Sequence, residues 1–140
     1  MLGRRPKEPV GPDLRLLCRE LMSGSVFGFL AERRNGLFPE ELFADLHPSR
    51  IGRPSVPPRV LACATVLQVL EKRADHDAVA ALRCDLCWKA AGGRGLYDTA
   101  FDPSLFICFR RRLALSGDRD RIFTRVREII TQTSVLKGRR

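Results

Sequence analysis

The stretch that decides the fold is Val60-Leu-Ala-Cys-Ala-Thr-Val-Leu-Gln-Val-Leu70, in which apolar side chains point in nearly every direction of a helical wheel. A helix without a polar face is normally covered on several sides by other helices. We therefore expect residues 60–70 to form the central helix of an all-α domain. The stretch is shorter than the ~18 residues of a membrane span, and no longer apolar run exists, so no membrane span is predicted.

Three shorter helices are expected on the N-terminal side of this stretch. The first is capped by Asp13, the second follows Ser23-Gly24-Ser25 and ends near Asn35-Gly36, and the third begins at Pro39 with Phe43 and Leu46 as its core residues. Residues 1–12 contain three prolines and two glycines and few apolar residues, which predicts a flexible arm.

Three longer helices are expected on the C-terminal side. Asp75 should cap a continuous helix that reaches Ala90 with Leu86 facing inward, a second should run from Pro103 to Ser116, and a third should follow Asp118. The outer side of this last helix should carry Arg121 and Arg125. No segment alternates with period two, so we predict an all-α fold: a single compact domain of about six or seven helices over residues 13–140.

The charge balance favours a polyanionic partner. The formal net charge is +9 and the pI is about 10.2. Residues 110–140 contain ten Lys or Arg against three acids, so most of the surplus lies in the last quarter of the chain. Nucleic acid is the first expectation and an anionic membrane surface the second. The basic N-terminus leads into Glu8 and two prolines rather than an apolar signal core, which predicts a cytoplasmic protein.

The predicted helix after Asp102 combines an apolar face with a cationic one. On a helical wheel Leu105, Phe106, Phe109 and Leu113 form a core-facing stripe. Arg111 points away from this stripe, and Arg110 and Arg112 lie on its two flanks. Such a helix could bind phosphates or guanine edges in a DNA major groove. It could equally be a solvated basic face whose Arg stems cover the core.

The cysteine pattern does not indicate a metal centre. Cys84-Asp-Leu-Cys87 has the spacing of half a zinc site, but the remaining cysteines and the two histidines, His47 and His76, supply no second pair. We therefore expect reduced, buried thiols at all five positions, which are Cys18, Cys63, Cys84, Cys87 and Cys108. No catalytic triad or strand-borne carboxylate cluster is evident, so neither a metal, a cofactor nor an enzyme is predicted.

Several short motifs occur in a characteristic order. They are Leu-Phe-Pro-Glu-Glu-Leu-Phe-Ala-Asp-Leu (37–46), Gly-Arg-Pro-Ser-Val-Pro (52–57), Asp-Ala-Val-Ala-Ala-Leu-Arg (77–83), Trp88-Lys89, Phe-Asp-Pro-Ser-Leu (101–105) and Val-Leu-Lys-Gly (135–138). From about Ser25 onward, the chain resembles the InsH-like N-terminal domain of bacterial insertion-sequence transposases with an acidic-triad (DDE-type) catalytic core.

This resemblance implies a helical domain with a helix-turn-helix-like part that binds the terminal inverted repeats of a transposon. Residues 75–90 and 103–116 would form the DNA reader, with the second helix in the groove. The basic positions that match are Arg53, in the Gly-Arg-Pro loop, and Arg110, Arg111 and Arg112. The full set of candidate DNA contacts is Arg53, Arg59, Ser104, Arg110, Arg111 and Arg112.

The chain also departs from these relatives. It stops at Gly138-Arg139-Arg140, near the point where relatives continue into the strand that carries the first catalytic aspartate. We therefore expect a truncated, DNA-binding portion without transposition activity of its own. Two alternatives stay open: a non-functional remnant that still folds, or a module that oligomerises with itself or with full-length transposase, for which the expected exposure of Ile107 and Leu115 would provide an apolar contact surface.

Overall fold

The computed structural model describes residues 14–17, 19, 24–46, 56–98 and 101–133. Within these ranges the chain forms seven α-helices, one 3-10 helix and no strand, which confirms the predicted all-α fold. The elements are α1 (Leu14–Leu17), α3 (Val26–Leu37), η1 (Glu40–Leu46), α4 (Pro58–Glu71), α5 (Asp75–Cys84), α6 (Leu86–Gly92), α7 (Ser104–Leu115) and α8 (Arg121–Thr133). The predicted arm over residues 1–12, the predicted cap Asp13 and the candidate Arg53 lie outside the described residues.

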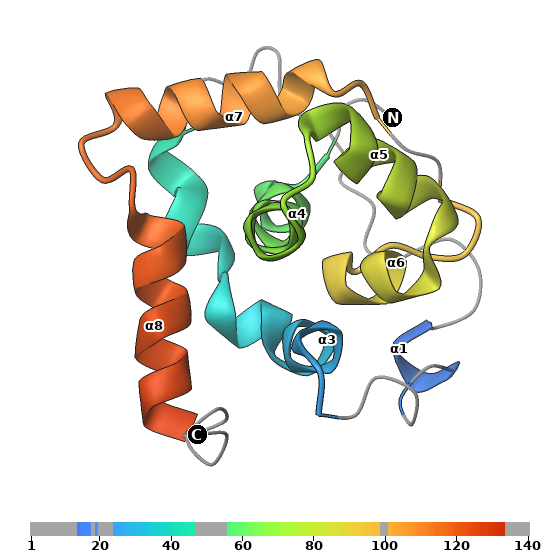
Figure 1. The fold of residues 1–140 in the computed structure, drawn as a ribbon. Coiled ribbons are helices and arrows are strands. Elements are labelled where there is room, and N and C mark those ends of the chain that lie inside the picture. Colours follow the sequence, from blue (N-terminus) through green and yellow to red (C-terminus); the bar gives the residue numbers. More distant parts are fainter. Residues whose placement is uncertain (1–13, 18, 20–23, 47–55, 99–100, 134–140) are drawn as a thin grey trace, which may run out of the picture.

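Helix α4 lies at the centre of the fold, as predicted. It contacts η1, α3, α5, α6, α7 and α8, and Figure 1 shows it end-on in the middle of the molecule. Pro58 is its first residue, where a missing N–H costs nothing. Its buried residues are Val60, Leu61, Ala62, Cys63, Ala64, Val66 and Leu67. Burial raises the pKa of the Cys63 thiol to about 12, so this cysteine stays protonated within the core.

The C-terminal turn of α4 departs from this pattern. Val69 and Leu70 are 57% and 56% exposed, although the sequence predicts a helix that is covered on several sides along residues 60–70. The expectation is wrong at this end because the neighbouring helices α3 and α8 do not close over the last turn. An apolar surface is left open there.

The predicted continuous helix from Asp75 to Ala90 is two helices. Asp85 has extended backbone geometry (φ −102°, ψ 119°), which separates α5 from α6. Its carboxylate accepts hydrogen bonds from the backbone N–H groups of Cys87 (2.8 Å) and Trp88 (3.3 Å), so it caps α6. Leu86 begins α6 and is 46% exposed rather than inward.

Asp75 is also placed differently from its prediction. It is the first residue of α5, and the N-cap position belongs to Ala74, which makes no side-chain cap. The carboxylate of Asp75 instead accepts hydrogen bonds from side chains of α4 and α7. The acidic first turn of α5 is thus correct, but the capping role is not.

The N-terminal helices largely follow their predictions. Ser25 caps α3 by accepting a hydrogen bond from the Gly28 N–H group (3.2 Å). The helix continues through Asn35-Gly36 to Leu37, one residue beyond the predicted stop. Residues 40–46 form a 3-10 helix, and its Phe43 and Leu46 side chains are buried as expected.

Replacing Leu67 by Ala tests the central role of α4. Leu67 is fully buried, so the cavity should lower the free energy of unfolding by roughly 2–5 kcal/mol. Leu115→Ala is the matched control because the same atoms are removed from a position of α7 that is 81% exposed, and it should change stability by no more than about 0.5 kcal/mol. Denaturant unfolding followed by circular dichroism gives both values. Equal losses would contradict the assignment of α4 as the core helix.

Candidate nucleic-acid interface

Helix α7, which carries the predicted cationic face, lies along one edge of the molecule (Figure 1). Its predicted inner stripe is confirmed: Phe106, Phe109 and Leu113 are buried, and Leu105 is half-buried and packs against the same core. The Phe109 ring packs against the Phe43 ring of η1, with centroids 5.9 Å apart. At the start of the helix the Asp102 carboxylate accepts a hydrogen bond from the Ser104 N–H group (2.9 Å), which lowers the pKa of Asp102. Helix α7 is therefore anchored on one side only.

The outer side of α7 is open to solvent and mixes apolar and basic side chains. Its exposed residues include Ser104, Ile107, Arg111 and Leu115, which are spaced three or four apart, and Cys108 next to Ile107. Ile107 is 49% and Leu115 81% exposed, as the sequence predicts. Within the described part of the chain, Arg111 has no hydrogen-bond or ion-pair partner. Its five N–H donors are thus available to a ligand.

Arg110 is occupied by an intramolecular partner. Its Nη1 donates to Asp75 Oδ1 (2.9 Å) and its Nη2 donates to Asp75 Oδ2 (2.7 Å). Gln68 Nε2 donates to the same carboxylate (2.9 Å). The bonds from Arg110 and Gln68 lower the pKa of Asp75, and the carboxylate raises the pKa of Arg110. This cluster ties α7 to the start of α5 and the end of α4.

Two further candidates donate to backbone carbonyls. Arg112 Nη1 donates to the Leu46 carbonyl at the end of η1 (2.8 Å). Arg59 is half-buried, and its Nε donates to the Phe38 carbonyl after α3 (2.8 Å). The structure therefore brings Ser104, Arg110, Arg111 and Arg112 together on α7. Arg59 instead lies where α4 packs against the end of α3.

Arg121 has a structural role that the sequence did not indicate. It is predicted to lie on the outer side of α8 but is only 5% exposed. Its guanidinium donates to both carboxylate oxygens of Asp45 (2.7 and 3.0 Å) and to the Leu42 carbonyl (2.7 Å). These bonds lower the pKa of Asp45 and raise that of Arg121. The prediction is wrong because the partner lies 76 residues away in the chain, beyond the reach of helical periodicity.

The prediction that Arg125 lies on the outer side of α8 is wrong for the same reason. Its Nε donates to the Leu37 carbonyl (3.0 Å) and its Nη2 to the Gly36 carbonyl (2.7 Å) at the end of α3. Arg121 and Arg125 together hold α8 against η1 and α3. Neither is available to a ligand in the way that an outward-facing arginine would be.

The thiols only partly follow their prediction. Cys63 is buried, Cys87 is half-buried, and Cys84 and Cys108 are exposed, whereas Cys18 lies outside the described residues. The expectation of buried thiols is wrong at Cys84 and Cys108 because both lie on the outer sides of their helices. Among the described positions no group of three or more His, Cys, Asp or Glu could hold a metal ion, and no helix there is long and apolar enough to span a membrane.

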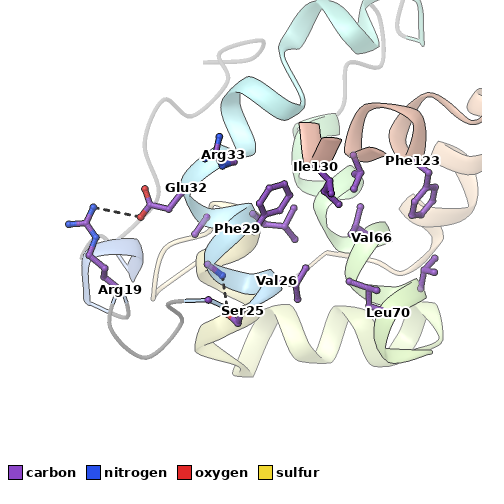
Figure 2. Close-up of a pocket in the computed structure, with 16 residues that line it drawn as sticks. Arg19, Ser25, Val26, Phe29, Glu32, Arg33, Val66, Leu70, Phe123 and Ile130 are labelled. Atoms are coloured by element: carbon purple, nitrogen blue, oxygen red, sulfur yellow. Dashed lines mark hydrogen bonds and ion pairs between the residues drawn. The ribbon is translucent and has the colours of Figure 1, made fainter. Parts of the chain in front are cut away.

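A second surface feature is an apolar groove between α3, α4 and α8, with a volume of about 1130 Å³ (Figure 2). Its apolar lining includes Val26, Phe29, Val66, Leu70, Phe123, Val126 and Ile130. Charged side chains at its edge come from Arg33 and from an Arg19–Glu32 ion pair (3.7 Å). The groove forms because the apolar face of α8 is only partly covered by the rest of the fold. Ile122 is buried, but Phe123 is 36% exposed and Val126 is half-buried.

A comparison with protein families relates the chain to a described family. A family model described as a transposase domain (DUF772) matches residues 28–112, which is more than half of the chain. The matched region begins in α3 and ends at Arg112 in α7, so it contains the three consecutive arginines. Neither a curated protein nor a solved structure matches the chain.

Removing Arg121 tests its clamping role. Arg121→Ala deletes several charge-assisted hydrogen bonds at once, so it should lower the free energy of unfolding by more than the ~1.5–3 kcal/mol of one such bond. Arg127→Ala removes the same side chain from an exposed position on α8 and should be close to neutral. Thermal and urea unfolding of the two variants provide the comparison. A stable Arg121→Ala protein would contradict the clamp.

Proposed function

Because the chain belongs to the transposase domain family DUF772, we propose that its transposition-related role is to bind duplex DNA at the terminal inverted repeats of a transposon. The outer face of α7 is the proposed reading surface. The observation that carries this proposal is that Arg111 has no hydrogen-bond or ion-pair partner among the described residues. It lies at the middle of an exposed face of α7 whose opposite side is anchored in the core.

The chemistry of this face suits a major groove. A guanidinium can donate two parallel hydrogen bonds to the O6 and N7 atoms of guanine, and apolar side chains can contact thymine methyl groups. Arg111 would supply the first kind of contact, and Ile107 the second. The hydroxyl of Ser104, at the start of the helix, suits a phosphate oxygen.

The other candidate residues position the helix, contact phosphate or stabilise the fold. Arg112 holds α7 on η1 through the Leu46 carbonyl, and the rigid helix that results favours accurate positioning of Arg111. Arg53 of the Gly-Arg-Pro motif, which lies outside the described residues, is proposed as a phosphate contact. Arg59 is assigned to the joint between α3 and α4 rather than to DNA. We assign no strand-transfer chemistry to these residues.

The proposal predicts a sequence-specific effect of Arg111→Ala. If Arg111 reads a base, its loss should cost about 1–3 kcal/mol of binding and relax the preference at one position of the site. Selection of random duplex DNA by the purified chain at about 0.15 M salt, where phosphate attraction is already weakened, should first yield an enriched motif. Arg111→Ala should then lose selectivity at one base pair of that motif.

Arg127→Ala removes the same charge from α8 and should leave the motif unchanged. Retention of DNA without enrichment, and with a steep loss on added salt, would contradict sequence-specific recognition. An enriched motif that Arg111→Ala leaves intact would contradict the orientation proposed for α7.

The apolar groove supports a second function, the self-association of this domain. We propose that the groove receives α8 of a second copy of this chain. Phe123, Val126 and Ile130 have the i, i+3, i+7 spacing of a helix ridge that packs into a groove. Arg33 and Glu32 are adjacent opposite charges at the edge, so a two-fold axis can place Arg33 of one copy near Glu32 of the other.

Light scattering coupled to size-exclusion chromatography tests this second function. The wild-type chain should be a dimer at micromolar concentration, and Leu70→Glu should be a monomer because it buries a charge in the interface. Leu115→Glu adds the same charge at an exposed apolar position on α7 and should remain a dimer. A monomeric wild-type chain, or a dimer that only Leu115→Glu disrupts, would exclude the groove as the contact surface.

A further inference from the structure

The two terminal nitrogens of Arg110 face a carboxylate instead of solvent. Nη1 and Nη2 each donate to a different oxygen of Asp75, at 2.9 and 2.7 Å. This end-on pairing uses the edge of the guanidinium that would bind a phosphate or a guanine bidentately. Figure 1 shows the start of α5 directly beside α7, so the acid reaches the flank of the proposed reading face. Arg111, the next residue, has no such partner among the described residues.

We propose that Asp75 determines specificity by occupying Arg110 in place of a DNA phosphate. This inference rests on the proposed DNA binding by α7 and adds a role that none of the sequence motifs indicated. A carboxylate that supported Arg110 for base reading would bind along the side of the guanidinium and leave its terminal nitrogens open. Here the end-on edge formed by the two terminal nitrogens is occupied and the charge is balanced by the carboxylate, so the pairing withdraws a cation from the interface.

The Arg110–Asp75 ion pair is exposed enough for Arg110 to exchange Asp75 for another anionic partner. The Arg110 side chain is 46% exposed, so it can turn toward solvent. Asp75 is 21% exposed and would retain the hydrogen bond from Gln68 Nε2 (2.9 Å) if Arg110 left. As the first residue of α5, its negative charge is also favoured by the helix dipole. An external phosphate must therefore compete with Asp75, but neither group of the pair would be buried without a partner afterwards.

The consequence concerns the balance between two kinds of DNA contact. Phosphate contacts by Arg and Lys add affinity for every sequence, whereas base contacts distinguish one sequence from another. Because Asp75 holds Arg110 away from phosphate, the sequence-independent part of the affinity is lowered. The contribution of Arg111 to discrimination is left intact.

Asp75→Asn tests the inference because it removes the charge and keeps the shape. Its affinity for random-sequence duplex DNA should rise by roughly ten- to a hundredfold, which is the worth of one charge-assisted hydrogen bond. The slope of log K against log salt should become steeper by about 0.9, as expected for one additional phosphate contact. The ratio of affinities for the selected motif and random DNA should fall.

Asp77→Asn is the matched control, since Asp77 is an exposed acid in the same first turn of α5 and does not bond Arg110. It makes the same change in net charge and should have a much smaller effect. In an Arg110→Ala background, Asp75→Asn should produce no gain. Thermal unfolding of each variant verifies that the folded fraction is unchanged at the assay temperature.

The outcomes separate this inference from the proposed function. Equal effects of Asp75→Asn and Asp77→Asn in a chain that binds DNA would overturn the inference alone. Weaker and less selective binding by Asp75→Asn would show that the acid supports Arg110, which also overturns it. If none of the proteins retains duplex DNA even at low salt, the proposed function itself fails, and the role of Asp75 fails with it.

Discussion

The need to cover α4 on nearly all sides is the constraint on which the rest of this structure depends. Six other elements contact this helix, and no apolar face of it is left over except in its last turn. Short helices that cross a central one at different directions bring many helix ends close to the core. The carbonyl groups at those ends have no partner within their own helix, so each needs a donor from elsewhere.

Arginine side chains supply many of these donors. Arg34 donates to the Ala90 and Ala91 carbonyls in the last turn of α6, and the Gly93 turn follows with φ +78°. A Cβ at this glycine would lie 2.8 Å from Arg34 Nε, so both the backbone geometry and the close approach require glycine there. Four other guanidinium groups also donate a hydrogen bond to a backbone carbonyl outside their own helix: those of Arg59, Arg112, Arg121 and Arg125. A long, planar cation with several donors can span the gap between two helices and also compensate the negative end of a helix dipole.

This use of arginine explains which features of the structure could be predicted from the sequence and which could not. Apolar periodicity located the central helix, the inner stripe of α7 and the core residues of η1, because local spacing determines which side of a helix is apolar. It could not locate the break at Asp85, where a side chain competes for the backbone N–H groups of the next turn. Nor could it show that Arg110 and Arg121 are paired, because their partners Asp75 and Asp45 come from distant parts of the chain. The net charge of +9 therefore overstates the cationic surface available to DNA.

The role of α8 follows from the same contacts. The region that matches the transposase family ends at Arg112, before the last three residues of α7 and all of α8. Yet Arg121 and Arg125 donate to the Leu42 and Leu37 carbonyls, which lie inside that region. Ile122 is buried in the same core as Phe106 and Phe109. A segment that stopped at Arg112 would lose these donors and part of this core, so the unit that holds α7 in place is larger than the region by which the family is identified.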